Sequence, residues 1–227
     1  MKSLTIRCTT KLKDHLGYFD PLSSLLGQFP NVKSLVVKYT PWSEEAVWVE
    51  RDPCNQQYTG IFKMEKKGMI RGPGIHFSHF TDELITIAPQ LEYLELVCPG
   101  TEHSGHPSFR APLRTLQQFT QLKRLCIPQG AFTLRTYGEP FHIYRIASSP
   151  LDVLPPTLEY LCMSHPSYHI IAWLGDILRY RDLLPNVKLV EMDLSDGTPD
   201  VASDYDDEMR KIGFALYNAG IDIRVKK

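Results

Sequence analysis

The stretch "LPPTLEYLCMSHPSYHIIAWLGDILRYRDLLPNVKLVEMDL" (154–194) joins two similar strand patterns through one amphipathic helix pattern. Apolar residues alternate with polar residues at 158–163 and again at 187–192, as they do in a half-buried strand. Between them, 167–184 carries a wide apolar stripe at helical spacing, and Pro185 ends it. Strand, helix and strand in this order predict two parallel strands joined by a crossover.

The same strand phrase recurs along the chain. It consists of an apolar residue, two variable residues, a second apolar residue, one variable residue and a third apolar residue. The full copies are "NVKSLVV" (31–37), "QLEYLEL" (90–96), "QLKRLCI" (121–127), "TLEYLCM" (157–163) and "NVKLVEM" (186–192). Their first apolar positions are 59, 31, 36 and 29 residues apart. Because "SLTI" (3–6) and "IDIRV" (221–225) fit the same frame, the chain is predicted to contain about seven parallel strands.

The alternation within these strands distinguishes a solenoid from a compact doubly wound sheet. Doubly wound strands are buried on both faces and form continuous apolar runs. Here polar or amphipathic residues such as Tyr93, Arg124 and Tyr160 alternate with the apolar ones. We therefore expect an α/β leucine-rich-repeat-like solenoid, with a curved parallel sheet, helices on its convex side and one open face.

Five segments between the strands carry helix signals. They are 20–29, 81–89, 111–119, 167–184 and 203–220. In the third segment Leu113, Leu116 and Phe119 fall on one helical face, and Gly220 is a natural stop for the last. These helices are expected to cover the buried face of the sheet.

Residues 40–80 form an insertion that is longer than a repeat connection requires. Two β-like runs, "EEAVWVERD" and "TGIFKMEKKG", flank "PCNQQY", which predicts a β-hairpin within a single domain of residues 1–227. A glycine–proline loop with His76 and His79 follows the hairpin. A hairpin folded over one end of the open sheet would turn a flat surface into a pocket.

Composition excludes several classes of partner. The 25 basic and 26 acidic residues give a formal charge of -1, which predicts neither a nucleic-acid nor a membrane partner. The N-terminus lacks the apolar run of a secretory signal, and no apolar stretch is long enough to span a membrane. Five cysteines, an odd number at scattered positions, do not suggest a disulfide framework. We therefore expect an intracellular protein, cytoplasmic or nuclear.

Histidine and cysteine are the candidates for chemistry. The histidines form three close pairs: His76 with His79, His103 with His106, and His165 with His169. These pairs lack the partners of a zinc motif, so we predict no metal and no cofactor, and we place the histidines on the rim of a candidate pocket. Cys126 and Cys162 occupy the same position in neighbouring repeats, where packing is favoured over a nucleophilic role. The chain contains no recognised catalytic motif, so we predict no catalytic residue.

Two sets of phrases carry a family resemblance. "LEYLEL", "LKRLCI" and "LEYLCM" match Leu-x-x-Leu-x-Leu, the strand half of a leucine-rich repeat. "FPNVKSLVV", "LPPTLEYLCMSHPS" and "LLPNVKLVEMDL" resemble the C-terminal repeat regions of fungal F-box proteins. The resemblance implies the substrate-recognition part of a ubiquitin ligase subunit. No F-box segment precedes the repeats in this sequence, so we expect a fragment of a longer F-box protein or, less favoured, a stand-alone repeat protein.

These observations lead to two functional hypotheses. The preferred one is a protein-binding module, not an enzyme, because solenoids bind extended partners on their sheet and tyrosine and arginine dominate binding hot spots. The expected contact residues are Lys38, Tyr93, Glu95, Arg124, Tyr160, Glu191, Asp193 and Arg224. The alternative is a stand-alone small-molecule-binding or catalytic protein, with its pocket between the 40–80 insertion and the histidine rim.

Overall fold

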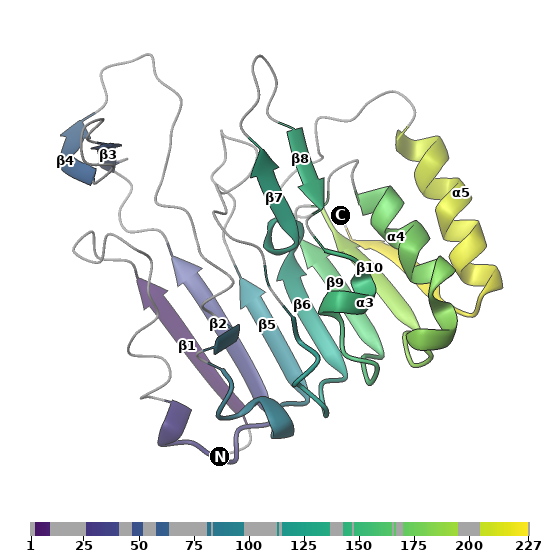
Figure 1. Ribbon diagram of the computed structural model, residues 1–227, viewed down its shortest axis with the longest axis horizontal. Coiled ribbons are helices and arrows are strands. Elements are labelled where there is room, and N and C mark those ends of the chain that lie inside the picture. Colours follow the sequence, from purple (N-terminus) through teal and green to yellow (C-terminus); the bar gives the residue numbers. More distant parts are fainter. Residues whose placement is uncertain are drawn as a thin grey trace.

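The computed structural model describes residues 3–9, 26–40, 47–51, 58–63, 81–82, 84–97, 113, 115–136, 143–146, 148–164, 166, 170–194 and 205–226. Seven strands form one sheet in which all neighbours are parallel: β1 (Ser3–Thr9), β2 (Ser34–Thr40), β5 (Tyr93–Val97), β6 (Arg124–Pro128), β9 (Tyr160–Ser164), β10 (Leu189–Asp193) and β11 (Asp222–Lys226). Their order across the sheet is their order along the chain (Figure 1).

This sheet confirms the α/β class and a strand at each of the seven predicted places. A doubly wound sheet reverses its strand order at a switch point, and the described sheet has no such reversal. Crossovers between parallel strands are almost always right-handed, so connections that all step in one direction lie on the same face of the sheet. The strand order therefore favours connections that cover one face of the sheet.

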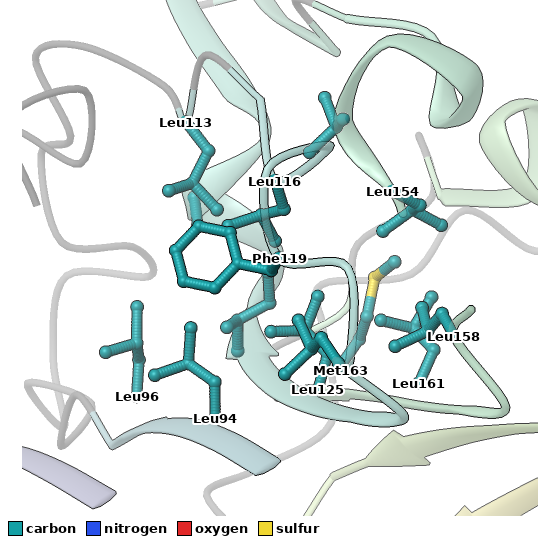
Figure 2. Packing of buried hydrophobic residues seen from close by; sticks show 14 of the residues in the cluster. Leu94, Leu96, Leu113, Leu116, Phe119, Leu125, Leu154, Leu158, Leu161 and Met163 are labelled. Atoms are coloured by element: carbon teal, nitrogen blue, oxygen red, sulfur yellow. The ribbon is translucent and has the colours of Figure 1, made fainter. Parts of the chain in front are cut away.

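The apolar positions of the strand phrase form the core. The first position is fully buried in all five copies, at Val32, Leu91, Leu122, Leu158 and Val187. The second position is equally buried, at Leu35, Leu94, Leu125, Leu161 and Val190, and so is the third, at Val37, Leu96, Ile127, Met163 and Met192. Figure 2 shows side chains of β5, β6 and β9 close to those of the connecting segments, among them Phe119 and Leu154. The predicted inward-facing positions are thus confirmed.

The α-helices with described bounds are α3 (Pro150–Val153), α4 (Ile170–Arg179) and α5 (Tyr205–Asn218). Short 3₁₀ helices occur at η1 (Ala88–Gln90), η2 (Gln129–Ala131) and η3 (Arg181–Leu183). The helices α4 and α5 confirm the predictions at 167–184 and 203–220 with shorter bounds, and they contact each other at the C-terminal end of the sheet (Figure 1). None of the described helices is long and apolar enough to cross a membrane.

The helix predicted at 111–119 is wrong for the part of this segment that the structure describes. Residues 113 and 115–119 form turns and extended backbone, although Leu113, Leu116 and Phe119 are buried as expected. The backbone N–H of Leu113 donates to the carbonyl of Ala131 at 2.7 Å, and that of Leu116 donates to the carbonyl of Val153 at 2.8 Å. These donors are satisfied by neighbouring connections, so the apolar spacing reflects a loop packed on the core rather than a helical face.

The segment predicted as a helix at 81–89 is also more irregular than expected. After a helical turn at 81–82, Ile85, Ile87 and Gln90 each donate to the carbonyl three residues earlier, which is the 3₁₀ pattern. Pro89 lacks an N–H group and cannot extend an α-helix through this stretch. Of the helix predicted at 20–29, residues 20–25 lie outside the described residues.

Two antiparallel strand pairs accompany the main sheet. Within the 40–80 insertion, β3 (Val47–Arg51) pairs with β4 (Tyr58–Lys63), where the sequence predicts a hairpin; the rest of the insertion after residue 40 lies outside the described part. A second pair, β7 (Thr133–Thr136) with β8 (Ile143–Ile146), follows β6 and was not predicted. The alternating residues of "FTLRT" and "HIYRI" are the signal that indicates this second pair.

The helix α5 ends in a turn that requires glycine. Gly220 has φ of 77°, its N–H donates to the carbonyl of Tyr217, and the N–H of Ile221 donates to the carbonyl of Leu216. This is the Schellman motif, and its usual apolar contact is present because Leu216 and Ile221 are both fully buried. The predicted helix stop is thereby confirmed, and it directs the chain into β11.

Replacing Gly220 by alanine is expected to lower the free energy of unfolding by about 1–2 kcal/mol, because a Cβ is strained at positive φ. No atom lies within 4 Å of the added Cβ, so packing does not contribute. Gly175→Ala in α4 is the matched control, since its Cβ also meets nothing within 4 Å and alanine favours the helix by about 1 kcal/mol. Urea denaturation should show opposite signs for the two variants; a stabilised Gly220 variant would contradict the turn geometry.

Candidate functional site

The face of the sheet opposite the core, which we call the open face, consists of three rows of side chains set by strand register. The first row is Ser34, Tyr93, Arg124, Tyr160, Leu189 and Asp222. The second is Val36, Glu95, Cys126, Cys162, Glu191 and Arg224. The third contains Lys38 beside Val97, and Pro128 beside Ser164, Asp193 and Lys226. All eight residues predicted to contact a partner lie in these rows.

The first row contains a three-residue stack at the middle of the sheet. The guanidinium carbon of Arg124 lies 5.6 Å from the ring centre of Tyr93 and 4.8 Å from that of Tyr160. Each cation–π contact of this kind contributes about 0.5–1 kcal/mol at an exposed site. Arg124 remains exposed while both tyrosines are half-buried, so the guanidinium stays accessible from the open face while it contacts both rings.

The two tyrosines keep their phenolic protons over the physiological pH range. Burial raises the pKa of Tyr93, and the hydrogen bond to the Glu95 carboxylate, 2.5 Å from the hydroxyl, raises it further. Burial likewise raises the pKa of Tyr160, with a further contribution from the nearby thiols of Cys162 and Cys126. The stack therefore combines one permanent cation with two neutral hydroxyl groups, and it joins the second row through Glu95.

The second row brings two cysteines together between two glutamates. Cys126 is the register partner of Cys162, and both are free thiols. The Tyr93 hydroxyl lies 3.8 Å from the sulfur of Cys126, and the sulfur of Cys162 lies 3.9 Å from Oε1 of Glu191. A hydrogen bond from Cys162 lowers the pKa of the Cys126 thiol. The same hydrogen bond raises the pKa of Cys162, and burial raises it further. The two thiols are thus chemically different.

The third row contains an ion pair between Lys226 and Asp193. Lys226 donates to Oδ2 of Asp193 at 2.8 Å, and this hydrogen bond raises the pKa of Lys226. The Asp193 side chain is 18% exposed, against 58% for Lys226, so the lysine covers the carboxylate. Of the predicted contact residues, Asp193 is therefore the one whose charge is already neutralised within the chain.

A ladder of alternating charge borders the open face just before the strands begin. Backbone hydrogen bonds place Lys33, Glu92, Lys123, Glu159 and Lys188 in this order across the sheet. Lys33 lies 2.6 Å from Glu92, and Lys188 lies 3.0 Å from Glu159. Such exposed pairs contribute little to stability. Opposite charges are neighbours in the observed strand order, whereas like charges directly opposite each other would destabilise the pairing. Sequence reasoning missed this ladder, whose signal is the Lys–Glu–Lys–Glu–Lys alternation after the first apolar position of each phrase.

The histidines of the predicted pocket rim lie outside the described residues. This holds for His76, His79, His103, His106, His165 and His169 alike. Among the residues that the structure does describe, no group of three or more His, Cys, Asp or Glu side chains is arranged to hold a metal ion. The described residues therefore provide geometry for the open face and not for the predicted histidine rim.

Comparison with protein-family models, curated proteins and solved structures finds no match for this chain.

Proposed function

We propose that the chain is a leucine-rich-repeat-like solenoid that binds a protein partner on its open face. The observation that carries the proposal is the stack of Tyr93, Arg124 and Tyr160, which lies on the sheet face that the described core does not cover. Tyrosine and arginine are the residues that most often dominate binding energy. Because the stack already orders these side chains, a partner that docks on them loses little further side-chain entropy.

The dimensions of the face suit an extended segment of a partner. Seven parallel strands spaced by about 4.8 Å span about 29 Å. An extended peptide rises about 3.3 Å per residue, so about nine residues would cross the whole face. A segment in this orientation would contact side chains of the rows rather than pair with a strand edge, which is the way solenoid sheets bind.

The charges of the face favour a protein over a polyanion. Arg124, Arg224 and Lys38 are interspersed with Glu95 and Glu191, so no continuous basic strip is present in the described rows. A partner with both an acidic group for Arg124 and apolar surface for the tyrosine rings would match the centre. The resemblance to F-box repeat regions supports a ubiquitin-ligase substrate as the class of partner.

The test is affinity capture with a variant of the stack. The variant Tyr93→Ala, Arg124→Glu, Tyr160→Ala should lose the partner, with an affinity at least about 30-fold weaker, because hot-spot residues contribute about 2 kcal/mol or more. A matched control on α5, Phe214→Ala, Arg210→Glu, Tyr217→Ala, likewise changes two aromatic residues and one arginine at exposed positions away from the face. Circular dichroism should show that both variants are folded, and titration calorimetry with the captured protein then gives the affinities.

Two outcomes contradict the proposal. One is a captured protein that the stack variant binds as tightly as wild type does, or that only the α5 control loses. The other is a small molecule that co-purifies with wild type while no protein does. The second result would instead support a small-molecule pocket beside the 40–80 insertion and the histidine rim.

A further inference from the structure

Cys126 and Cys162 are register partners on the adjacent parallel strands β6 and β9. Neighbouring strands lie about 4.8 Å apart, which falls within the range of about 4.4–6.8 Å between the α-carbons of disulfide-bonded cysteines. Their side chains lie next to each other on the open face, because register partners of a parallel pair point to the same face. A disulfide can therefore join the two residues once their side chains tilt toward each other.

The two thiols differ in exposure. Cys126 is half-buried, whereas Cys162 is 8% exposed. A small reagent in solution can thus approach Cys126 from the open face, while the neighbouring Cys162 is buried, with its sulfur 3.9 Å from the Glu191 carboxylate. This is the arrangement of an attacking thiol backed by a resolving thiol.

We propose that Cys126 and Cys162 are a redox-active dithiol that low-molecular-weight disulfides, such as glutathione disulfide, convert into an intramolecular disulfide. The chemistry does not depend on the proposed binding function, and only its consequence for a partner rests on that function. In the reducing compartment that the sequence predicts, a disulfide of this kind is transient rather than structural.

The reaction proceeds in two balanced exchange steps. The Cys126 thiolate attacks one sulfur of the small disulfide, which forms a mixed disulfide and releases one equivalent of thiolate. The Cys162 thiol loses its proton and attacks the Cys126 sulfur, which forms the protein disulfide and releases the second thiolate. Protonation of the two leaving groups gives two small thiols, so the protein loses two protons and two electrons to the reagent. Excess thiol reverses both steps.

The surroundings of the pair favour this division of roles. Hydrogen bonding from Cys162 lowers the pKa of the Cys126 thiol, and the Arg124 guanidinium contributes in the same direction, against burial and the Glu95 carboxylate. Cys162 has a raised pKa and retains its proton until the mixed disulfide forms. A low-pKa, accessible thiol beside a resolving thiol is the pattern of a redox-responsive pair.

The geometry also favours reversibility. Side chains of register partners on parallel strands point in the same direction, so closing the bond requires the two Cβ atoms to tilt toward each other. A disulfide formed under such strain is readily reduced. Closure would also shift the Cys126 sulfur away from the Tyr93 hydroxyl at 3.8 Å, and it would therefore alter the second row beside the stack.

The test treats the full chain with excess glutathione disulfide, blocks remaining thiols with N-ethylmaleimide and maps peptides without reduction. Wild type should yield a peptide pair linked through Cys126 and Cys162, and dithiothreitol should restore both thiols to alkylation. In Cys162→Ser, glutathione should stay attached to Cys126. In Cys126→Ser, residue 162 should remain a free thiol at the same dose, which alkylation in urea would show. Circular dichroism verifies that both variants are folded.

Several results would overturn this inference in wild type itself, without reference to any variant. They are a glutathione adduct that persists on Cys126, two thiols that both remain free, or a disulfide to Cys8, Cys54 or Cys98 in preference to the pair. The mass readout needs no partner, so failure of the dithiol chemistry is distinguishable from failure of the binding proposal. The same treatment of urea-unfolded chain should lose the preference for the 126–162 linkage, because that preference depends on strand register.

Discussion

Replacement of Trp173 by alanine is expected to lower the free energy of unfolding by about 3–5 kcal/mol, the range for large aromatic residues in a core. Trp173 is 2% exposed, and its ring stacks on that of Phe132 with centroids 5.0 Å apart. Its indole N–H donates to the carbonyl of Ser148 at 3.1 Å. This side chain thereby ties α4 to the segment after β6 and to the segment before α3, so its removal leaves a cavity between three parts of the chain.

Guanidinium denaturation followed by circular dichroism measures this loss. Trp173→Phe is the control, because it keeps an aromatic ring in place and loses mainly the hydrogen bond, which contributes about 1 kcal/mol. A loss below about 1 kcal/mol for the alanine variant would contradict the position of α4 against the sheet. The same scan on wild type supplies the reference slope, which should be unchanged if the unfolded states are alike.

Leu125→Ala is the second change with a large expected effect, a loss of about 2–5 kcal/mol. Leu125 is at the middle of the sheet, has no exposed surface and packs among the leucines of neighbouring strands (Figure 2). Its cavity is bounded by strands on both sides, so the surroundings can collapse only in part. The loss should therefore lie in the upper half of this range.

Arg124→Ala is the matched control for Leu125→Ala, because the two residues are adjacent on β6 and point to opposite faces. Its expected loss is about 1 kcal/mol, from the two cation–π contacts with Tyr93 and Tyr160. Chemical denaturation of both variants under one set of conditions tests the one-sided sheet directly. Equal losses would mean that both faces are buried, which would also remove the basis for the proposed binding surface.

The residues of the proposed binding surface are separate from those that stabilise the fold. Side chains of the strand phrase that point inward set the stability, whereas Tyr93, Arg124 and Tyr160 point outward and contribute little to it. Substitutions in the stack should therefore change binding without unfolding the chain, which is what the capture experiment requires. Cys126 and Cys162 lie in the row beside the stack, so a redox change there would act on the surface without disturbing the core.

Local patterns predicted some connections better than others. The helices α4 and α5 were predictable because each carries a long apolar stripe, and α5 also ends at a glycine stop. The segment 113–119 carries a similar but shorter stripe and forms no helix in its described residues, where the N–H groups of Leu113 and Leu116 bond to neighbouring connections. Apolar spacing shows which side chains are buried. It does not show where the backbone donors of a short segment find their acceptors.

The sequence by itself determined the seven strands of the main sheet, their parallel direction and the set of inward-facing residues, because alternation along a strand is a local property with a period of two residues. It also identified the outward residues one by one. Only the tertiary structure decided which of them meet. Arg124 lies 31 residues after Tyr93 and 36 before Tyr160, and Cys126 lies 36 before Cys162, so these contacts exist only through strand register. The repeat phrase aligns these positions, but the contacts between them form only when strands about thirty residues apart in the sequence pair side by side.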